Sequence, residues 1–210
     1  MPPPSSNTSL FTVGHSSLEL AEFLKQLTTH QVKIICDVRS RPRSFRFPQF
    51  NREPLEACLA SAGIQYEFHG ESLGGRPSDP RAYHADGVVN YEIRRRAADF
   101  CAGIDRVLEL SRPSNIALMC AEEDPLQCHR FLMICPALME HGVMPLHIRR
   151  GGGLESQRDA EDRLLELHDL AAFDSASLFA FERDTAIKDA LRLQAQEFAF
   201  RASAEATEYF

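Results

Sequence analysis

The sequence has no tryptophan, no long apolar run and no overall positive charge, and each absence excludes something. With no Trp and 14 Phe, phenylalanine must supply most of the aromatic packing. No stretch approaches the roughly 20 apolar residues of a membrane-spanning helix, so we expect no membrane association. Residues 1–9 have neither the basic start nor the apolar segment of a secretion signal. We expect them to form a disordered leader on a cytoplasmic protein.

Basic residues are outnumbered by acidic ones, 23 to 30. The net charge is −7, and all of it comes from Glu155 onward, where 6 basic residues face 13 acidic ones; the part through Leu154 has 17 of each. Strong non-specific nucleic-acid binding needs a broad basic field, so nucleic acid is not a favoured partner. One stretch has arginines with no acid among them, which suits either anion capture or a solvated loop: Arg39, Arg41, Arg43, Arg46 and Arg52.

The chain has 6 cysteines, and their setting does not favour a disulfide framework. Four of them lie within apolar patterns, where we expect reduced core residues: Cys36, Cys58, Cys101 and Cys135. Cys120 and Cys128 instead lie among polar residues, and they require a separate interpretation.

Short apolar runs alternate with helical patterns along the chain, which predicts an α/β fold with a doubly wound, mostly parallel five-stranded sheet. We expect the α/β core domain over residues 10–153 and a helical extension packed on the core over 154–210. An apolar stripe in the extension would pack on the domain or form a homodimer contact. The expected strands cover 10–13, 32–38, 64–68, 115–120 and 143–148, and the main helices 17–28, 52–62, 91–110, 128–141, 156–170 and 185–201.

Polar clusters follow four of the expected strands. Ligands bind at the carboxyl edge of a parallel sheet, where the ends of distant strands meet. We therefore expect the clusters to share one cleft that binds a small anionic ligand. The candidates are His15 after the first strand, Asp37, Arg39, Arg43 and Ser44 after the second, Gly74 and Gly75 after the third, and Glu122, Cys128 and Arg130 after the fourth.

Cys128 is the candidate nucleophile of this cleft. It is expected at the amino end of a helix beside His129 and Arg130, and backbone N–H groups and adjacent cations favour a thiolate. A thiolate there could act as a nucleophile, a redox switch or a metal ligand, with Glu122 as general base or as a group that orients His129. In the structural alternative, Glu122 pairs with Arg130 and Cys128 is inert.

The remaining candidates would bind substrate or transfer protons. We expect His15 to share proton transfer with Glu122 or to donate to an anion, and Arg39, Arg43 and Arg130 to hold the anion. Asp37 could cap its loop or bind a ligand hydroxyl. Ser44, Gly74 and Gly75 could bring hydroxyl and backbone donors to the same group.

A metal centre is not indicated by the spacing. Zinc needs about four ligands, and Cys120, Cys128, His129 and His15 could be gathered, but Cys-x7-Cys-His is not a familiar zinc signature. We expect no metal and no cofactor. A structural metal domain is the third alternative, which metal analysis of the purified protein tests.

Four blocks resemble one family. They are Thr12-x-Gly14-His15-Ser16, Asp37-Val38-Arg39-x-x-Pro42-x-Ser44, Leu73-Gly74-Gly75 and Cys120-x-Glu122-x5-Cys128-His129-Arg130, in that order. Together they resemble the signature blocks of the family called domain of unknown function 488. The resemblance spans about Leu10 to Arg201 and includes a terminal helix at residues 190–196. It implies a compact α/β domain and a Cys-containing motif set of enzymatic type, without a particular reaction.

The residues lead to two functional hypotheses. The first is an enzyme of hydrolase or transferase type that acts on a small anionic substrate, such as a nucleotide or another phosphorylated compound. The second is a non-catalytic sensor module that uses the same cleft to bind a nucleotide or a nucleic-acid end, for which the arginine stretch is the best support.

Overall fold

The computed structural model describes residues 8–170 and 180–202, which form a mixed α/β fold around a six-stranded sheet. The strand order is β3-β2-β4-β1-β5-β6, and only the β5–β6 pair is antiparallel within this sheet. The strands are β1 (Leu10–Gly14), β2 (Ile34–Asp37), β3 (Gln65–Phe68), β4 (Ile116–Cys120), β5 (Leu146–Ile148) and β6 (Leu154–Ser156).

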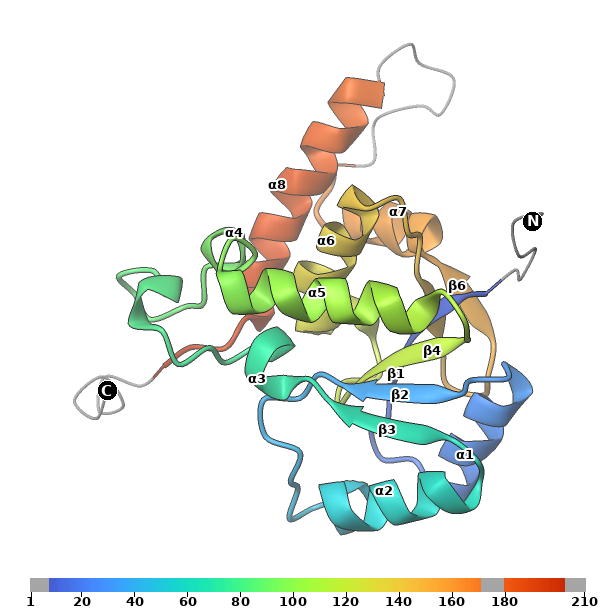
Figure 1. Cartoon of the computed structure of the whole chain (residues 1–210). Coiled ribbons are helices and arrows are strands. Elements are labelled where there is room, and N and C mark those ends of the chain that lie inside the picture. The colour runs from blue at the N-terminus through green and yellow to red at the C-terminus, as the bar shows by residue number, and fades with distance from the viewer. Residues whose placement is uncertain (1–7, 171–179, 203–210) are drawn as a thin grey trace, which may run out of the picture.

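Helices cover both faces of the sheet (Figure 1), as in a doubly wound fold. Short 3₁₀ turns cover Pro48–Phe50, Pro80–Ala82 and Pro125–Gln127, and a π-helical turn covers Arg130–Ile134. The α-helices are α1 (Leu20–Thr29), α2 (Arg52–Ser61), α3 (Gly70–Leu73), α4 (Tyr91–Arg94), α5 (Ala98–Ser111), α6 (Cys135–Glu140), α7 (Gln157–Leu167) and α8 (Ala180–Phe198).

The central strands are buried on both faces, which explains their nearly continuous apolar sequences. All five residues of β1 and of β4 are buried. On one face the sheet packs against α1 and α2 through Phe23, Leu27 and Leu59. On the other face it packs against α5, α6 and α7, and the partly buried side of α8 joins that core.

The register brings the ends of β1, β2 and β4 to one edge. Gly14 pairs with Cys120, and Asp37 pairs with Met119. The chain leaves β1 toward α1 on one face and leaves β4 toward α6 on the other. The two loops after these neighbouring strands therefore diverge, which makes the switch-point crevice where ligands bind in α/β folds.

Several predicted elements differ in detail. The sheet has a sixth strand, because Leu154–Ser156, which we placed in the helical extension, pairs antiparallel with β5. The predicted helix over 91–110 is interrupted between α4 and α5. The helix predicted over 17–28 begins later than expected: Ser16 has a left-handed φ of 46°, and α1 begins at Leu20 with Glu19 as its N-cap.

The predicted helix over 128–141 contains a π-helical turn before α6. Pro136 has no N–H and would clash with the carbonyl four residues earlier in a regular helix, and the wider turn removes that conflict. Two of the four presumed core cysteines are misassigned, since Cys58 is half-buried and Cys101 is exposed.

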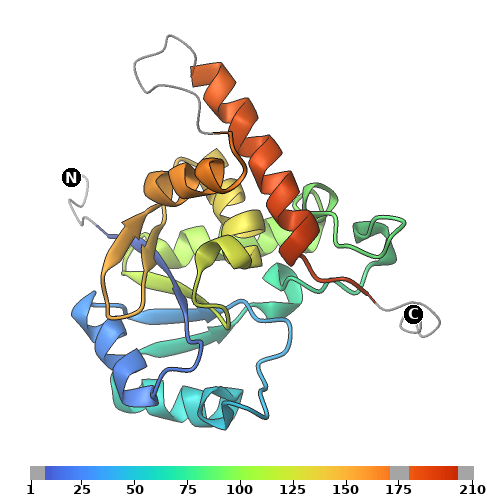
Figure 2. The ribbon, with the colours of Figure 1, turned by 180° about the vertical axis from the view of Figure 1, so that it is seen from behind.

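The last described segment of the chain returns to the carboxyl edge of the sheet. Helix α8 contacts α7 and runs toward the loops near α3 and α4 (Figure 2), and the backbone then pairs with residues 87–89. Gln194 Nε2 donates to the carbonyl of Leu126, a buried contact at 3.0 Å. Most of the expected leader, residues 1–7, lies outside the described residues. None of the described helices has the length and apolar character needed to cross a membrane.

Candidate functional site

A cavity of about 710 Å³ lies at the carboxyl edge of the sheet, over the crevice between β1 and β4. The loops after β1, β2 and β4 form its floor and one wall, and the end of α8 contributes to the other wall. Its chemically distinctive lining residues are His15, Arg39, Arg41, Arg43, Ser44, Arg46, Gly75, Arg76, Tyr91, Cys120, Glu122, Cys128, His129, Phe198 and Phe200.

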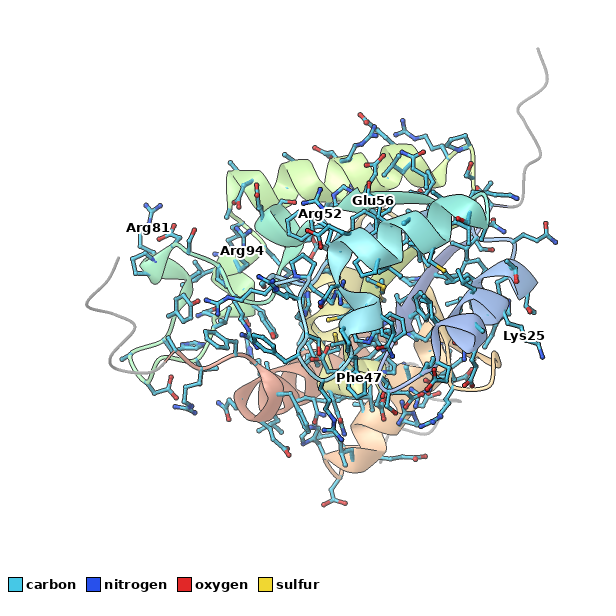
Figure 3. The ribbon with its side chains drawn as sticks, turned by 90° about the horizontal axis from the view of Figure 1, so that it is seen from below. Lys25, Phe47, Arg52, Glu56, Arg81 and Arg94 are labelled. Atoms are coloured by element: carbon cyan, nitrogen blue, oxygen red, sulfur yellow. The ribbon has the colours of Figure 1, made fainter. Side chains whose placement is uncertain are left out.

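The cavity is cationic in a protein of net charge −7. Five arginines line it, and Glu122 is its only acidic lining residue among the described residues. Arg41, Arg43 and Arg46 are exposed, and none of the three pairs with a carboxylate of the described chain. Arg46 packs its guanidinium over the Phe47 ring, and Arg52, at the start of α2 (Figure 3), packs over the rings of Tyr66 and Phe68. The loop arginines are thus available to an external anion.

Arg39 is held rigidly at the floor of the cavity. Its Nε and Nη2 donate to the two carboxylate oxygens of Asp37 at 2.9 and 2.6 Å, and the Tyr66 hydroxyl donates to the same carboxylate at 2.7 Å. Burial would lower the pKa of Arg39, but the bonds to Asp37 and its charge outweigh burial and raise it. Arg39 is therefore a fixed positive charge that needs no ligand to stay ordered.

His15 accepts from Arg39 and completes this network. Its Nδ1 donates to the carbonyl of Ser16 at 3.0 Å, and its Nε2 accepts from Arg39 Nη1 at 3.2 Å. Burial, and then the charge of Arg39, lower the pKa of His15 to about 4. The ring also stacks on Phe50 with centroids 4.2 Å apart. Both nitrogens of a neutral imidazole are thus occupied, which favours a positioning role for His15 over proton transfer.

The loop between β4 and the following helix is built around Arg130. This side chain is 1% exposed, and its Nη1 and Nη2 donate to the carbonyls of Glu122 and Glu123 at 2.6 and 2.7 Å. Gly14 on β1 lies directly against the same Glu122 carbonyl, where a Cβ would overlap the oxygen. Arg130 and Gly14 therefore shape the loop that carries the candidate chemistry.

Cys128 lies where this loop enters the helix. Its backbone is extended, with φ −138° and ψ 140°, and its carbonyl accepts from the amides of Phe131 and Leu132. The thiol is thus placed at the amino end of the continuous helical segment 129–140, as the sequence predicts. Burial raises the pKa of Cys128, but hydrogen bonding from Cys120 and the charges of Arg130 and His129 bring it well below its ordinary value.

His129 connects the two cysteines. Its Nδ1 lies 3.8 Å from the Sγ of Cys120 and 3.8 Å from that of Cys128, and its Nε2 donates to the carbonyl of Val38 at 3.0 Å. Burial lowers the pKa of His129, but the Cys128 charge outweighs it and raises the pKa. A Cβ on Gly75 would lie 2.9 Å from the His129 ring, so glycine allows the ring to pack there. The lowered pKa of Cys128 and the raised pKa of His129 thus favour a thiolate beside an imidazolium.

Glu122 and Cys120 complete the cluster. The Cys120 sulfur lies 2.9 Å from Glu122 Oε2. Hydrogen bonding to Cys128 and burial raise the pKa of Cys120 well above its ordinary value, so it remains a thiol. Glu122 is solvent-accessible at the cavity, yet its carboxyl oxygen faces the buried sulfur. Withdrawal from water and the Cys128 charge raise the pKa of Glu122, which suits a group that donates and accepts protons.

Most predicted site residues come together in this cavity. Seven line it: His15, Arg39, Arg43, Ser44, Gly75, Glu122 and Cys128. Three do not. Asp37 is fully buried and binds Arg39, Arg130 binds loop carbonyls, and Gly74 packs against the backbone of Gly70 and Ser40. These three support the residues that line the cavity. The expected Glu122–Arg130 contact forms through the Glu122 carbonyl, not its carboxylate.

Other lining residues were absent from the predicted set. His129 adjoins Cys128 in sequence, and that adjacency was the available signal. Tyr91 lies at the start of α4, while Phe198 and Phe200 reach the cavity because the segment at and after the end of α8 folds back, which no local pattern indicates. Arg76 packs its guanidinium over the Phe200 ring at 4.6 Å and links the long connection after α3 to the chain end.

The comparison with protein families agrees with this motif set. The family described as Domain of unknown function DUF488 matches residues 19–134. The chain belongs to this family. The matched part contains the second, third and fourth blocks, while the Gly14–Ser16 block and the end of α8 lie outside it. Comparisons with curated proteins and with solved structures gave no match.

Proposed function

We propose that this DUF488 protein is an enzyme of hydrolase or transferase type, which uses Cys128 to attack a small phosphorylated substrate. The observation that carries the proposal is the Cys128–His129 pair at the floor of an arginine-lined cavity. A thiolate is the reactive form of cysteine, and cations beside it keep it ionised.

The loop arginines would bind the substrate's phosphate. Arg43 and its neighbours Arg41 and Arg46 are exposed to the cavity, while Arg39 adds a fixed charge below them. Ser44 lines the same wall. Phe47, Phe198 and Phe200 also line the cavity and provide surfaces for an aromatic group, which includes nucleotides among the candidate substrates.

Glu122 would transfer the proton in both halves of the reaction. The Cys128 sulfur forms a bond to phosphorus, the bond to the leaving oxygen breaks, and the Glu122 carboxyl protonates that oxygen. Glu122 then takes a proton from water, or from an acceptor hydroxyl in a transferase. The oxygen of that water or hydroxyl attacks phosphorus, and the Cys128 thiolate leaves. The raised pKa of Glu122 makes a protonated carboxyl available for the first half. His15 would keep Arg39 in place.

Turnover of phosphate esters by the Cys128→Ser variant tests the proposal. We expect wild-type protein to hydrolyse a member of a panel of nucleoside monophosphates and p-nitrophenyl phosphate. Cys128→Ser should lose at least about 10³-fold in kcat while still binding the substrate. Cys101→Ser, which changes an exposed cysteine outside the cavity, is the matched control. Undiminished turnover by Cys128→Ser, or loss of turnover in both variants, would contradict the assigned nucleophile.

A second function is favoured by Phe45. This side chain is 99% exposed between Arg43 and Arg46. Aromatic rings interleaved with arginines form stacking platforms for single-stranded nucleic acid. In this alternative the module binds a nucleic-acid end without catalysis. Binding of a labelled oligonucleotide that falls with salt and is lost in Phe45→Ala, without turnover by wild-type protein, would favour it over the enzyme.

A further inference from the structure

The side chains of Cys120, Cys128 and His129 converge on one point. Their donor atoms all lie within 4.8 Å of one another, and the two S···N distances are both 3.8 Å. Tetrahedral zinc with Zn–S near 2.3 Å and Zn–N near 2.0–2.1 Å requires S···N separations of roughly 3.6 Å. The three donors therefore have the spacing of one face of a zinc tetrahedron after small side-chain shifts.

We propose that Cys120, Cys128 and His129 bind Zn²⁺, with Glu122 or water as the fourth ligand. The Oε2 atom of Glu122 already lies 2.9 Å from the Cys120 sulfur. Two thiolates and an imidazole form a ligand set that binds zinc in preference to magnesium or calcium, because those two ions take oxygen ligands.

The surroundings of His129 support metal ligation. Its Nε2 donates to the Val38 carbonyl, so Nδ1 faces the two sulfurs and offers them a metal-binding lone pair once its proton is released. Metal-bound histidines almost always donate their second nitrogen in this way, which orients the ring. Gly75 packs against the ring and holds it there.

Charge and access also fit the proposal. Cys120 and Cys128 are only 4% and 2% exposed, yet both line the cavity, so an ion can enter from solvent. Zinc would displace the Cys120 thiol proton and the one proton that Cys128 and His129 share. Bound zinc would also occupy the Cys128 sulfur and switch off the proposed nucleophile. The site is therefore an inhibitory one.

Zinc and cobalt titration of the reduced full-length chain tests the site. We expect one equivalent of Zn²⁺ in competition with a chromophoric chelator, weakened at least about tenfold in Cys120→Ser and in Cys128→Ser. Bound Co²⁺ should give a thiolate charge-transfer band that falls to about half in either variant, since one of the two thiolates is lost. Circular dichroism shows whether each variant is folded, and His129→Gln gives a third variant in which both sulfurs remain.

Cys58→Ser and Cys101→Ser are matched controls, because both cysteines lie outside the cluster. Unchanged metal binding in folded Cys128→Ser or His129→Gln would overturn the site, as would binding that depends on the control cysteines. Binding is measured without substrate, so this test and the test of the activity can fail separately. Reduced protein that takes up no zinc, while its Cys128 still reacts with iodoacetamide, overturns the zinc site alone.

Discussion

Two arginine-rich regions of the molecule differ in what their guanidinium groups contact. Around β5, β6 and α7, Arg149 and Arg163 are joined to Asp124 and Glu155 at distances of 2.6 to 3.1 Å. In the loop after β2, Arg41, Arg43 and Arg46 have no carboxylate partner among residues 8–170 and 180–202. The first region uses arginine to join secondary-structure elements. The second exposes arginine to the cavity, and this difference points to an external anion.

Arg130 belongs with the arginines that stabilise the fold, and its replacement should have the largest effect on stability. Arg130→Met leaves the carbonyls of Glu122 and Glu123 without their buried donor. We expect a loss of about 3 kcal/mol in the free energy of unfolding, because bonds from a buried charged group are removed. Urea unfolding measures it. A loss below about 0.5 kcal/mol would show that the loop does not depend on Arg130.

His15 should make stability depend on pH. Its folded pKa of about 4 lies below the ordinary 6.5, so the unfolded chain binds the extra proton first. The contribution of neutral His15 to the free energy of unfolding is therefore fully present above pH 6.5 and is lost as the pH falls toward 4. The loss from this 2%-exposed group is up to about 3 kcal/mol.

The His15→Gln variant isolates that effect. We expect a smaller loss of unfolding free energy between pH 6.5 and 4 in this variant than in wild type, since other buried groups act equally in both. His141→Asn, which removes an exposed imidazole, is the control. Equal slopes in wild type and His15→Gln would mean that the imidazole is not buried in its neutral form.

Arg43 should affect binding and leave stability unchanged. Arg43→Ala is expected to weaken binding of inorganic phosphate about tenfold, or about 1.4 kcal/mol, because a charged donor to the anion is lost. Isothermal titration calorimetry measures the affinity, and thermal unfolding without phosphate should remain within about 0.5 kcal/mol of wild type. Unchanged affinity would place the anion elsewhere.

Arg163 should affect stability and leave phosphate binding unchanged, and its effect should be smaller than that of Arg43. Arg163→Ala breaks the pairs with Asp124 and Glu155, but the arginine is 39% exposed, so solvent screens it. We expect a loss of at most about 1 kcal/mol that decreases in high salt, with phosphate affinity unchanged. Weaker phosphate binding in this variant would remove the distinction between the two regions.

Much of the fold could be predicted because the central strands have a strong local signal. The central strands β1, β2 and β4 are short apolar runs, and the apolar stripe of α1 predicts that helix. Strand β6 has no such signal, since Leu154 is 47% exposed at the sheet edge. At the break after Arg94, the Arg94 side chain binds nearby Asp99 and also the carbonyl of the distant Ser72, which no local pattern indicates.

The candidate site could be predicted only in part. Cys128, Glu122 and His129 lie within eight residues of one another, so local sequence brings them together. Asp37 and Arg39 lie two residues apart in the sequence, but the sequence does not show that the Asp37 carboxylate is fully buried and holds the Arg39 side chain in place. Phe198 and Phe200 reach the cavity through tertiary packing of the chain end, which the sequence pattern does not encode.

The rate of Cys128 alkylation tests the central claim most directly. Reduced, EDTA-treated protein is reacted with iodoacetamide at pH 7, and each cysteine is followed by mass spectrometry with and without inorganic phosphate. We predict that Cys128 reacts faster than the exposed Cys101 despite its burial, and that phosphate slows Cys128 alone. A Cys128 that reacts more slowly than Cys101 and ignores phosphate would contradict a thiolate at the floor of an anion-binding cavity.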